Sequence, residues 1–250
     1  MSKPHLLLAS QSPRRRELLA LLGIPFEVTA SNVTEVPRAD ESPVALAIRL
    51  SQAKARAACS EASPQPSLRR LRIASAAEQF PMDKDASGFK STHKPSQGFD
   101  AIIIACDTVV ALDGEMLGKP RNAAEATAML RRLRGRRHTV HSAVTMLETT
   151  TGHTLTDVAE TQVVMRAYTD AEMAAYVASG DPLDKAGAYA IQHSGFRPVA
   201  ELRGCYANVM GLPLCHLIRC LRVWEVEPLQ DVPTVCQAHT CHHCSVHARM

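Results

Sequence analysis

Two short apolar runs limit the folds that this chain can adopt. Residues 101–105 form a continuous apolar run centred on three isoleucines, which is typical of a strand buried on both faces. Residues 6–8 are three leucines that indicate a second buried strand, and Ser12 and Pro13 then mark the N-cap and the first residue of a helix. Strands buried on both faces need helices on both sides of their sheet. The sequence therefore predicts an α/β fold, a large twisted mixed sheet flanked by helices.

Local signals predict the remaining elements. A helix is expected to begin at Ser42 and Pro43 and to carry Lys54 near its end. Asn122 and Glu125 form an N-x-x-E helix start. The other expected elements are an antiparallel strand pair over residues 139–147 and 155–168, a helix over 170–178, a strand over 199–202 and a helix over 212–221.

Two segments differ in composition from the rest of the chain. Residues 59–98 mix Ser, Pro, Gln and charged residues without a sustained period, so we expect a flexible insertion there. Residues 228–250 are rich in Cys and His and poor in apolar residues, so we expect a disordered tail behind a single domain over residues 1–227. Cys241 and Cys244 have the spacing of zinc ligands, but no second, properly spaced pair accompanies them. Zinc is therefore not expected in the tail.

Composition and charge exclude several classes of function. The formal net charge of +3 at pH 7 is too small to indicate a nucleic-acid or membrane partner. No apolar stretch approaches the roughly 20 residues that cross a bilayer, and no secretory leader is visible, so we expect a cytoplasmic protein. Several of the eight cysteines lie in apolar segments, where a reduced thiol behaves as a small hydrophobe. A disulfide scaffold is not expected.

Two polar clusters indicate a phosphate ligand. Residues 14–16 are three arginines beside the N-terminus of the first expected helix, where free N–H groups and the helix dipole favour an anion. A solvated helix face would explain the arginines equally well. Asp107 comes directly after the run 101–105, where α/β sheets bind ligands, and Thr108 and Lys119 follow it. Asp107 is thus a candidate to activate water or to hold a metal, the alternative being a turn or helix cap.

Four motifs in this order and spacing resemble the Maf family of nucleoside triphosphate pyrophosphatases, the septum formation proteins. They are Cys106-Asp107-Thr108, Gly118-Lys119-Pro120, residues 184–192 and residues 208–213, and the match runs from about residue 6 to about residue 222. The resemblance implies two lobes around a deep cleft, similar to the inosine triphosphate pyrophosphatase fold. The form of residues 186–192 resembles the branch of the family that acts on dTTP and UTP.

The resemblance also implies roles for individual residues. Asp107 corresponds to a proton acceptor, and Glu35 would share a divalent ion with it, Mg²⁺ or Mn²⁺ rather than Zn²⁺ because the ligands are hard oxygens. Gly187 would let the backbone approach the ligand. The expected catalytic residues are Asp107, Lys119 and Glu35, the expected substrate-binding residues are Ser12, Arg14, Arg15, Lys54, Thr108, Asp184, Lys185 and Gln192, and the expected metal ligands are Glu35 and Asp107.

The expected reaction is hydrolysis of dTTP and UTP between the α and β phosphates, which releases a monophosphate and pyrophosphate. Positions matching Arg14, Thr108 and Gln192 contribute to specificity in that branch of the family. Three alternatives stay open at this point: a modified pyrimidine nucleotide as substrate, a homodimer, and a nucleotide-binding regulator of cell division without significant turnover. An RNA-binding module is disfavoured because no aromatic side chains interleave with the basic clusters.

Overall fold

A seven-stranded mixed sheet forms the centre of the molecule. The structure, a computed structural model, describes residues 4–62, 100–244 and 246. The strands are β1 His5–Ala9, β2 Phe26–Thr29, β3 Ala101–Leu112, β4 Glu115–Leu117, β5 Arg137–Glu148, β6 Thr154–Met165 and β7 Val199–Arg203. They follow the order β2-β1-β3-β5-β6-β7, with β4 paired to β3 off this path. The first three strands are parallel and the later pairs are antiparallel, which confirms the expected mixed sheet.

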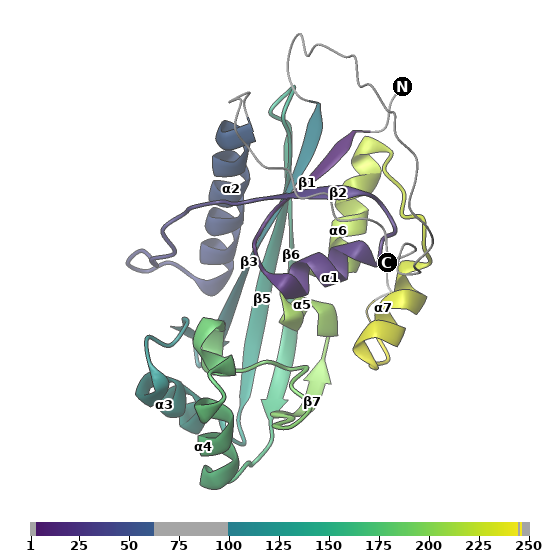
Figure 1. The fold of residues 1–250 in the computed structure, drawn as a ribbon. Coiled ribbons are helices and arrows are strands. Elements are labelled where there is room, and N and C mark those ends of the chain that lie inside the picture. The colour runs from purple at the N-terminus through teal and green to yellow at the C-terminus, as the bar shows by residue number, and fades with distance from the viewer. Residues whose placement is uncertain (1–3, 63–99, 245, 247–250) are drawn as a thin grey trace, which may run out of the picture.

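Helices cover both faces of the sheet. They are α1 Pro13–Ala20, α2 Pro43–Ala62, α3 Ala123–Leu133, α4 Asp170–Ala178, α5 Tyr206–Met210, α6 Leu214–Leu221 and α7 Val232–Thr240, with three short 3₁₀ turns at η1 Asp181–Asp184, η2 Ala186–Ala188 and η3 Arg222–Trp224. Helix α2 lies on one side of the strands, and α1, α5 and α6 lie on the other (Figure 1). The α/β layering that the buried strands required is therefore present.

Helix starts agree with their capping signals. Helix α1 begins at Pro13 after Ser12 as the N-cap, although the Ser12 side chain makes no cap hydrogen bond. Asn122 accepts a hydrogen bond from the Glu125 N–H at the start of α3. Thr169 and its partner three residues later form a complete capping box on α4. These local signals depend only on neighbouring residues, which is why the sequence displays them.

Two elements are longer than predicted, and this changes where two site residues lie. Strand β3 continues from Ala101 to Leu112, so Asp107 lies inside the strand and not directly after it. The continuation has a physical cause, since β5 pairs with β3 along residues 102–111. Helix α2 runs to Ala62, so Lys54 lies in its interior rather than near its end, and residues 59–62 belong to the helix rather than to the insertion. The rest of the expected insertion, residues 63–98, lies outside the described residues.

The tail contains ordered structure where disorder was expected. Helix α7 buries Val232, which is 2% exposed, and the Leu229 N–H donates a hydrogen bond to the Leu22 carbonyl at 2.9 Å. Cys244 is also buried. The apolar residues are few, but they face the same side of α7 and pack against α5 and α6. The limit of the domain at residue 227 stays a prediction.

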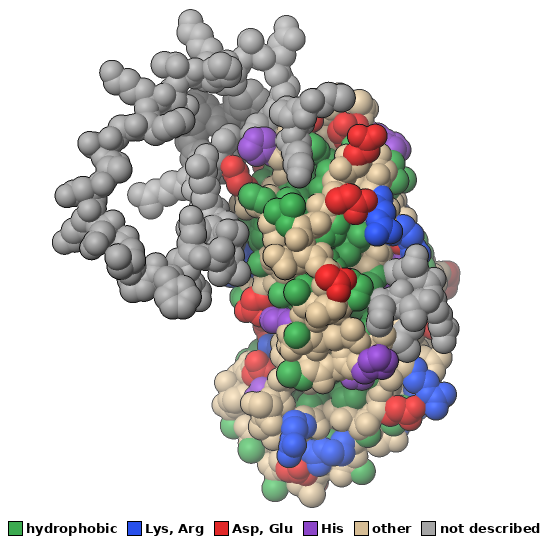
Figure 2. Space-filling model, turned by 90° about the vertical axis from the view of Figure 1, so that its right-hand side faces the viewer, with side chains coloured by type: hydrophobic (Ala, Val, Ile, Leu, Met, Phe, Trp, Pro, Cys, Tyr) green, Lys and Arg blue, Asp and Glu red, His purple; other side chains and the backbone are tan. Residues whose placement is uncertain are grey.

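The described surface carries both signs of charge. On the face shown in Figure 2, acidic and basic side chains are interspersed among polar and apolar ones. No helix among the described residues is long and apolar enough to cross a membrane. The electrostatics of this face give no reason to assign it to a polyanion.

Candidate active site

One cavity of about 1230 Å³ brings the predicted site together. Every residue that the sequence assigned to the site lies on its wall, namely Ser12, Arg14, Arg15, Glu35, Lys54, Asp107, Thr108, Lys119, Asp184, Lys185 and Gln192. These residues come from segments far apart in the chain, from the start of α1 to the loop after η2. The volume is sufficient for a nucleotide, because sites for small molecules generally have volumes of about 300–1,000 Å³.

The cavity lies against a gap in the sheet. Strand β1 pairs with residues 101–104 of β3, and β4 pairs with residues 110–112. Between them, no described strand lies beside residues 105–109 on that edge of β3. Asp107 therefore lies where the ladder is interrupted, although it is in the middle of its own strand.

Successive residues of β3 supply two different walls. Asp107 points to the face covered by α2, together with Ala105 and Val109. Thr108 points to the opposite face, as the period of two along a strand requires, and meets Arg15 of α1 there. The cavity thus includes a carboxylate wall and a hydroxyl wall on the two sides of one strand.

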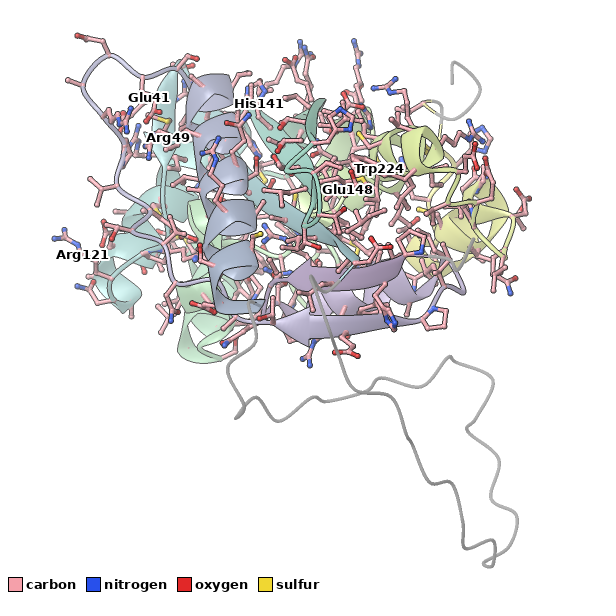
Figure 3. The ribbon with its side chains drawn as sticks, turned by 90° about the horizontal axis from the view of Figure 1, so that it is seen from above. Glu41, Arg49, Arg121, His141, Glu148 and Trp224 are labelled. Carbon is pink, nitrogen blue, oxygen red and sulfur yellow. The ribbon has the colours of Figure 1, made fainter. Side chains whose placement is uncertain are left out.

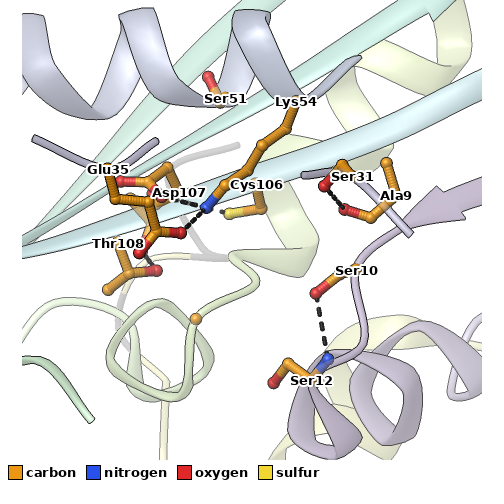
Figure 4. A network of polar contacts seen from close by, with 12 residues as sticks. Ala9, Ser10, Ser12, Ser31, Glu35, Ser51, Lys54, Cys106, Asp107 and Thr108 are labelled. Carbon is orange, nitrogen blue, oxygen red and sulfur yellow. Dashed lines mark hydrogen bonds and ion pairs between the residues drawn. The ribbon is translucent and has the colours of Figure 1, made fainter. Parts of the chain in front are cut away.

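Lys54 connects the two carboxylates on the α2 side. Its Nζ donates to Glu35 Oε1 at 2.5 Å and to Asp107 Oδ1 at 2.6 Å (Figure 4). The Lys54 and Asp107 side chains are 9% and 7% exposed, so this ion pair is buried. Lys119 reaches the other oxygen of Glu35 at 3.0 Å. The result is an alternating row of two cations and two carboxylates along one wall.

The electrostatics of this row act most strongly on Glu35. Partial burial alone would raise the pKa of Glu35, but hydrogen bonds and charges from Lys54 and then Lys119 outweigh it and lower the pKa from 4.5 to about 2. Glu35 is therefore ionised throughout the physiological range of pH. Its position in a loop is held by neighbouring contacts rather than by secondary structure.

An arginine on α2 fixes the loop that carries Glu35. Arg49 donates to both oxygens of Glu41 at 2.6 and 2.7 Å and to the Val36 carbonyl at 3.0 Å. Glu41 and Arg49 lie beside each other where this loop passes α2 (Figure 3). A planar guanidinium that binds a carboxylate through two nitrogens also sets its orientation. Arg49 thereby positions Glu35 over Lys54.

On the opposite wall, the arginines of α1 differ in what they contact. Arg15 Nε donates to the Gly211 carbonyl at 2.9 Å, and its other nitrogens contact Thr108 Oγ1 at 3.3 Å and Ser10 Oγ at 3.4 Å. Arg15 therefore joins α1 to the turn after α5. Arg14 also lines the cavity. The predicted pair thus divides into the tethered Arg15 and Arg14, for which no hydrogen bond or ion pair is found among the described residues.

The loop of residues 184–192 contributes a third wall. Lys185 is 8% exposed, and its ammonium binds the Asp184 carboxylate at 2.6 Å and the Asp181 backbone carbonyl at 2.5 Å, so it holds the loop's own shape. Gly187 has φ +71°, and a Cβ there would meet the Val110 side chain at 3.1 Å. The positive φ and the packing against β3 both favour glycine here, and the expected backbone approach to a ligand stays a prediction. Gln192 is exposed on the cavity wall.

Three residues of the site were given no individual role from the sequence, although Tyr189 and Asn208 lie within the motifs 184–192 and 208–213. Tyr189 lines the cavity, and its hydroxyl is 2.8 Å from Nε2 of the buried His138. Burial lowers the pKa of His138 to about 4, so this imidazole is neutral at pH 7. Ser142 and Asn208, both fully buried, lie behind Thr108. A sheet register would have been needed to find Ser142, because only pairing along β5 places it opposite Thr108.

The donor set fits a divalent cation that is held largely by its substrate. Lys54 uses one oxygen each of Glu35 and Asp107, and the hydrogen bonds described for Asp107 involve Oδ1 alone. Among the described residues no group of three or more His, Cys, Asp or Glu side chains is placed to hold a metal. Mg²⁺ commonly uses one or two carboxylates and completes its shell with phosphates and water. A free carboxylate oxygen beside a cation-lined cavity is consistent with that mode.

Comparison with known proteins places this geometry in a family. The sequence profile described as Maf-like protein matches residues 5–224. A dTTP/UTP pyrophosphatase of Myxococcus xanthus is 42% identical over 86% of this chain and 90% of its own length. Similar proteins of the same name from Syntrophus aciditrophicus and Salinibacter ruber are 38% and 40% identical, over 89% and 87% of this chain and 91% and 89% of their own lengths. This chain belongs to the Maf family.

Proposed function

We propose that this chain hydrolyses dTTP and UTP to the nucleoside monophosphate and pyrophosphate. The observation that carries the proposal is the row of Asp107, Lys54, Glu35 and Lys119, which faces a cavity with cationic side chains on both walls. The relatives that bear the name dTTP/UTP pyrophosphatase span almost the whole of this chain. The reaction is a displacement at the α phosphorus, in which water attacks and pyrophosphate leaves.

The protein's own groups divide the work of that displacement. Asp107 accepts a proton from the attacking water, and Lys54 fixes the direction in which Asp107 presents its second oxygen. Arg14 and Lys119 stabilise negative charge that develops on the phosphate oxygens. Glu35 holds the ammonium groups of Lys119 and Lys54 in fixed positions relative to each other.

The proposal includes a divalent cation, Mg²⁺ or Mn²⁺. Asp107 and Glu35 would hold it together with the phosphates of the nucleotide. When bound, it supplies positive charge that neutralises the polyphosphate. The residues already described support the proposal because their hard oxygens suit both ions.

The proposal extends to the shape of the site, the recognition of the base, the location of the protein and its oligomeric state. The cavity would be the cleft between two lobes of a fold similar to that of inosine triphosphate pyrophosphatase. The Gln192 amide offers one donor and one acceptor, which complement the N–H and carbonyl edge of thymine or uracil. A cytoplasmic location is expected from the sequence alone, and a homodimer is left open.

The test is turnover of a panel of normal and modified nucleoside triphosphates by the purified chain, with the products separated. We expect dTTP and UTP to give monophosphate and pyrophosphate, and activity to disappear when the divalent cation is chelated. Release of orthophosphate and a diphosphate would contradict the cleavage site. Tight nucleotide binding without turnover would favour the alternative, a nucleotide-binding regulator.

Replacement of Asp107 by Asn tests the assignment of the base. This change keeps the size of the side chain and its neighbours but removes the basic oxygen, so kcat should fall about 10²–10⁴-fold while nucleotide still binds. Calorimetric titration with a non-hydrolysable analogue separates the two effects. Near-normal turnover by the folded variant would move the search for the base to Glu35 or Asp184.

A further inference from the structure

Four cysteines meet where the tail packs against the rest of the molecule. Helix α7 contacts both α5 and α6 (Figure 1). Cys205 is the N-cap of α5, Cys215 lies in the first turn of α6, Cys236 lies on α7, and Cys244 follows the end of α7. Each of these thiols interacts with at least one of the other three. All of them are free thiols in the structure.

Two of the four are in direct contact. The side chains of Cys205 and Cys244 are hydrogen-bonded to each other, and the two residues are 4% and 9% exposed. The ring centroids of Tyr206 and His242, which lie beside them in the sequence, are 5.5 Å apart. The end of the tail therefore lies along the start of α5, and the meeting of the two sulfur atoms is part of a larger contact.

Local hydrogen bonds hold both cysteines in place. Cys205 Sγ accepts a hydrogen bond from the Asn208 N–H at 3.3 Å and so caps α5. The Cys244 N–H donates to Gln237 Oε1 at 2.8 Å, and Gln237 Nε2 donates to the Pro233 carbonyl at 3.2 Å. The segment after α7 is thus tied back to its own helix, which presents Cys244 to Cys205.

We propose that Cys205 and Cys244 form a disulfide when the protein meets a disulfide oxidant such as glutathione disulfide, and that this bond links the tail covalently to α5. Thiols in hydrogen-bond contact need only a small movement to reach the geometry of a disulfide. Cys215 and Cys236 influence this pair through charge alone, at longer range. The direct contact therefore selects Cys205 and Cys244 as partners.

The chemistry balances in two exchange steps. The thiolate of one cysteine attacks glutathione disulfide, forms a mixed disulfide and releases one glutathione. The other cysteine then attacks the protein sulfur of the mixed disulfide and releases the second glutathione. Two protein thiols are oxidised to one disulfide, glutathione disulfide is reduced to two thiols, and the two protons from the protein end on glutathione.

The surroundings of the pair make this exchange slow and dependent on pH. The hydrogen bond with Cys244, together with burial, raises the pKa of the Cys205 thiol well above its usual value. Burial likewise raises the pKa of Cys236 to about 11. Because the thiolate is the attacking form, the rate of cross-linking should rise about tenfold for each pH unit below the pKa. The bond then records a sustained exposure to oxidant rather than a brief one.

Helix α5 connects this pair to the cavity. Cys205 begins the helix, and Met210 and Gly211 at its other end line the cavity. The Gly211 carbonyl also accepts the hydrogen bond from Arg15. The proposed disulfide therefore lies one short helix away from the candidate active site and outside it.

The test is cross-linking of the purified full chain with glutathione disulfide at pH 8. The remaining thiols are then blocked with N-ethylmaleimide, and trypsin releases residues 204–219, which contain Cys205, and residues 223–249, which contain Cys244, as separate peptides. We expect the two peptides to be joined, with a mass lower than their sum by two hydrogen atoms. Reduction should separate them.

The cross-link should also raise the Tm of the protein. The bond closes a loop of about 40 residues and so restricts the unfolded chain, which predicts a Tm about 5–10 °C higher than that of the reduced protein. A thermal melt before and after addition of a reductant measures the difference.

Matched serine variants identify the two cysteines. Cys205→Ser keeps a hydroxyl that can cap α5, and it should abolish both the cross-link and the rise in Tm. Cys244→Ser should do the same. Cys215→Ser and Cys236→Ser each remove another thiol of the cluster and should retain both effects.

Three results would overturn the inference. They are a wild-type protein that carries only glutathione mixed disulfides, a cross-link of undiminished yield in Cys205→Ser, and stoichiometric zinc in the purified chain by elemental analysis, since the thiols would then be metal ligands. If Cys205→Ser fails to fold, the contrast between Cys244→Ser and Cys236→Ser decides. These measurements need no nucleotide, so their outcome is independent of the proposed hydrolysis.

Discussion

Lys54 is a buried cation in an otherwise apolar stripe. Leu46, Leu50, Lys54 and Ala58 recur every four residues on α2 and face the sheet. The strand below presents its own alternating stripe, in which Asp107 is the charged member. Loss of Lys54 leaves Asp107 as a buried charge without its cation, whereas loss of Asp107 leaves Lys54 still paired with Glu35.

Replacement of Lys54 by Met therefore destabilises the protein. We expect the free energy of unfolding to fall by about 3–5 kcal/mol, as measured by urea denaturation at pH 7. The double variant Lys54→Met with Asp107→Asn should recover much of this loss, because the unpaired charge is gone. Additive losses in the double-variant cycle would show that the two groups are not coupled.

The pH dependence of stability should report Glu35. A carboxylate whose pKa falls on folding stabilises the protein above its unfolded pKa, and this contribution is lost as the pH falls through its folded pKa. For Glu35 the window runs from about 4.5 down to about 2. The difference in unfolding free energy between wild type and Glu35→Gln should be full at pH 7 and shrink across this window. Lys119→Met should move the loss to higher pH, since one cation that lowers this pKa is then absent.

At the scale of elements, local signals and the antiparallel pair of β5 and β6 were predicted from the sequence, and the pairing of β3 was not. The starts of α1, α3 and α4 follow from their own capping residues. The full length of β3 depends on its partner β5, and the short β4 has too few residues to show a pattern. For the site, the motifs identified residues that line one cavity, while their roles stay predictions. The contacts of Lys54 and Ser142 could not be predicted from the sequence, because they depend on which face of α2 and which residue of β5 lie against β3.

Arg49 of α2 holds the loop that carries Glu35. Arg49→Gln should lower kcat/KM by about tenfold while the protein stays folded, because the loop loses the bidentate contact that orients Glu35. Steady-state kinetics with UTP and a thermal melt provide the measurement. Arg219→Gln breaks another arginine–carboxylate contact, with Asp157 on β6, and should leave kcat/KM unchanged. An equal loss in both variants would contradict a specific role for Arg49.

At the scale of the whole molecule, the tail belongs to the folded body. Helix α7 packs beside α6, and its approach fixes the turn after α1 through the Leu22 carbonyl. The packing of α7 was hard to predict because the tail has few apolar residues. A single well-placed side chain is enough when the opposing surface is already formed. Removal of residues 228–250 should therefore cost stability even if the chemistry continues.

Val232→Ala tests this role of the tail. Truncation of a valine that is 2% exposed should lower the free energy of unfolding by roughly 1–2 kcal/mol. Thr234→Ala, at an exposed position of the same helix, should change it by less than about 0.5 kcal/mol. Urea denaturation of both variants gives the comparison. Equal stabilities would mean that α7 adds nothing to the fold, and UTP turnover at 25 °C should be normal in both.

The gap beside residues 105–109 of β3 also sets a limit on how this protein can change. Further pairing at the end of β1, together with an extension of β4 toward Asp107, would close this gap in the ladder and gain backbone hydrogen bonds. The same change would fill the cavity with main chain. Insertions that lengthen either strand should therefore be tolerated for folding and eliminated for activity. Selection for activity on the substrate therefore keeps β1 and β4 short, although longer strands would make a more stable sheet.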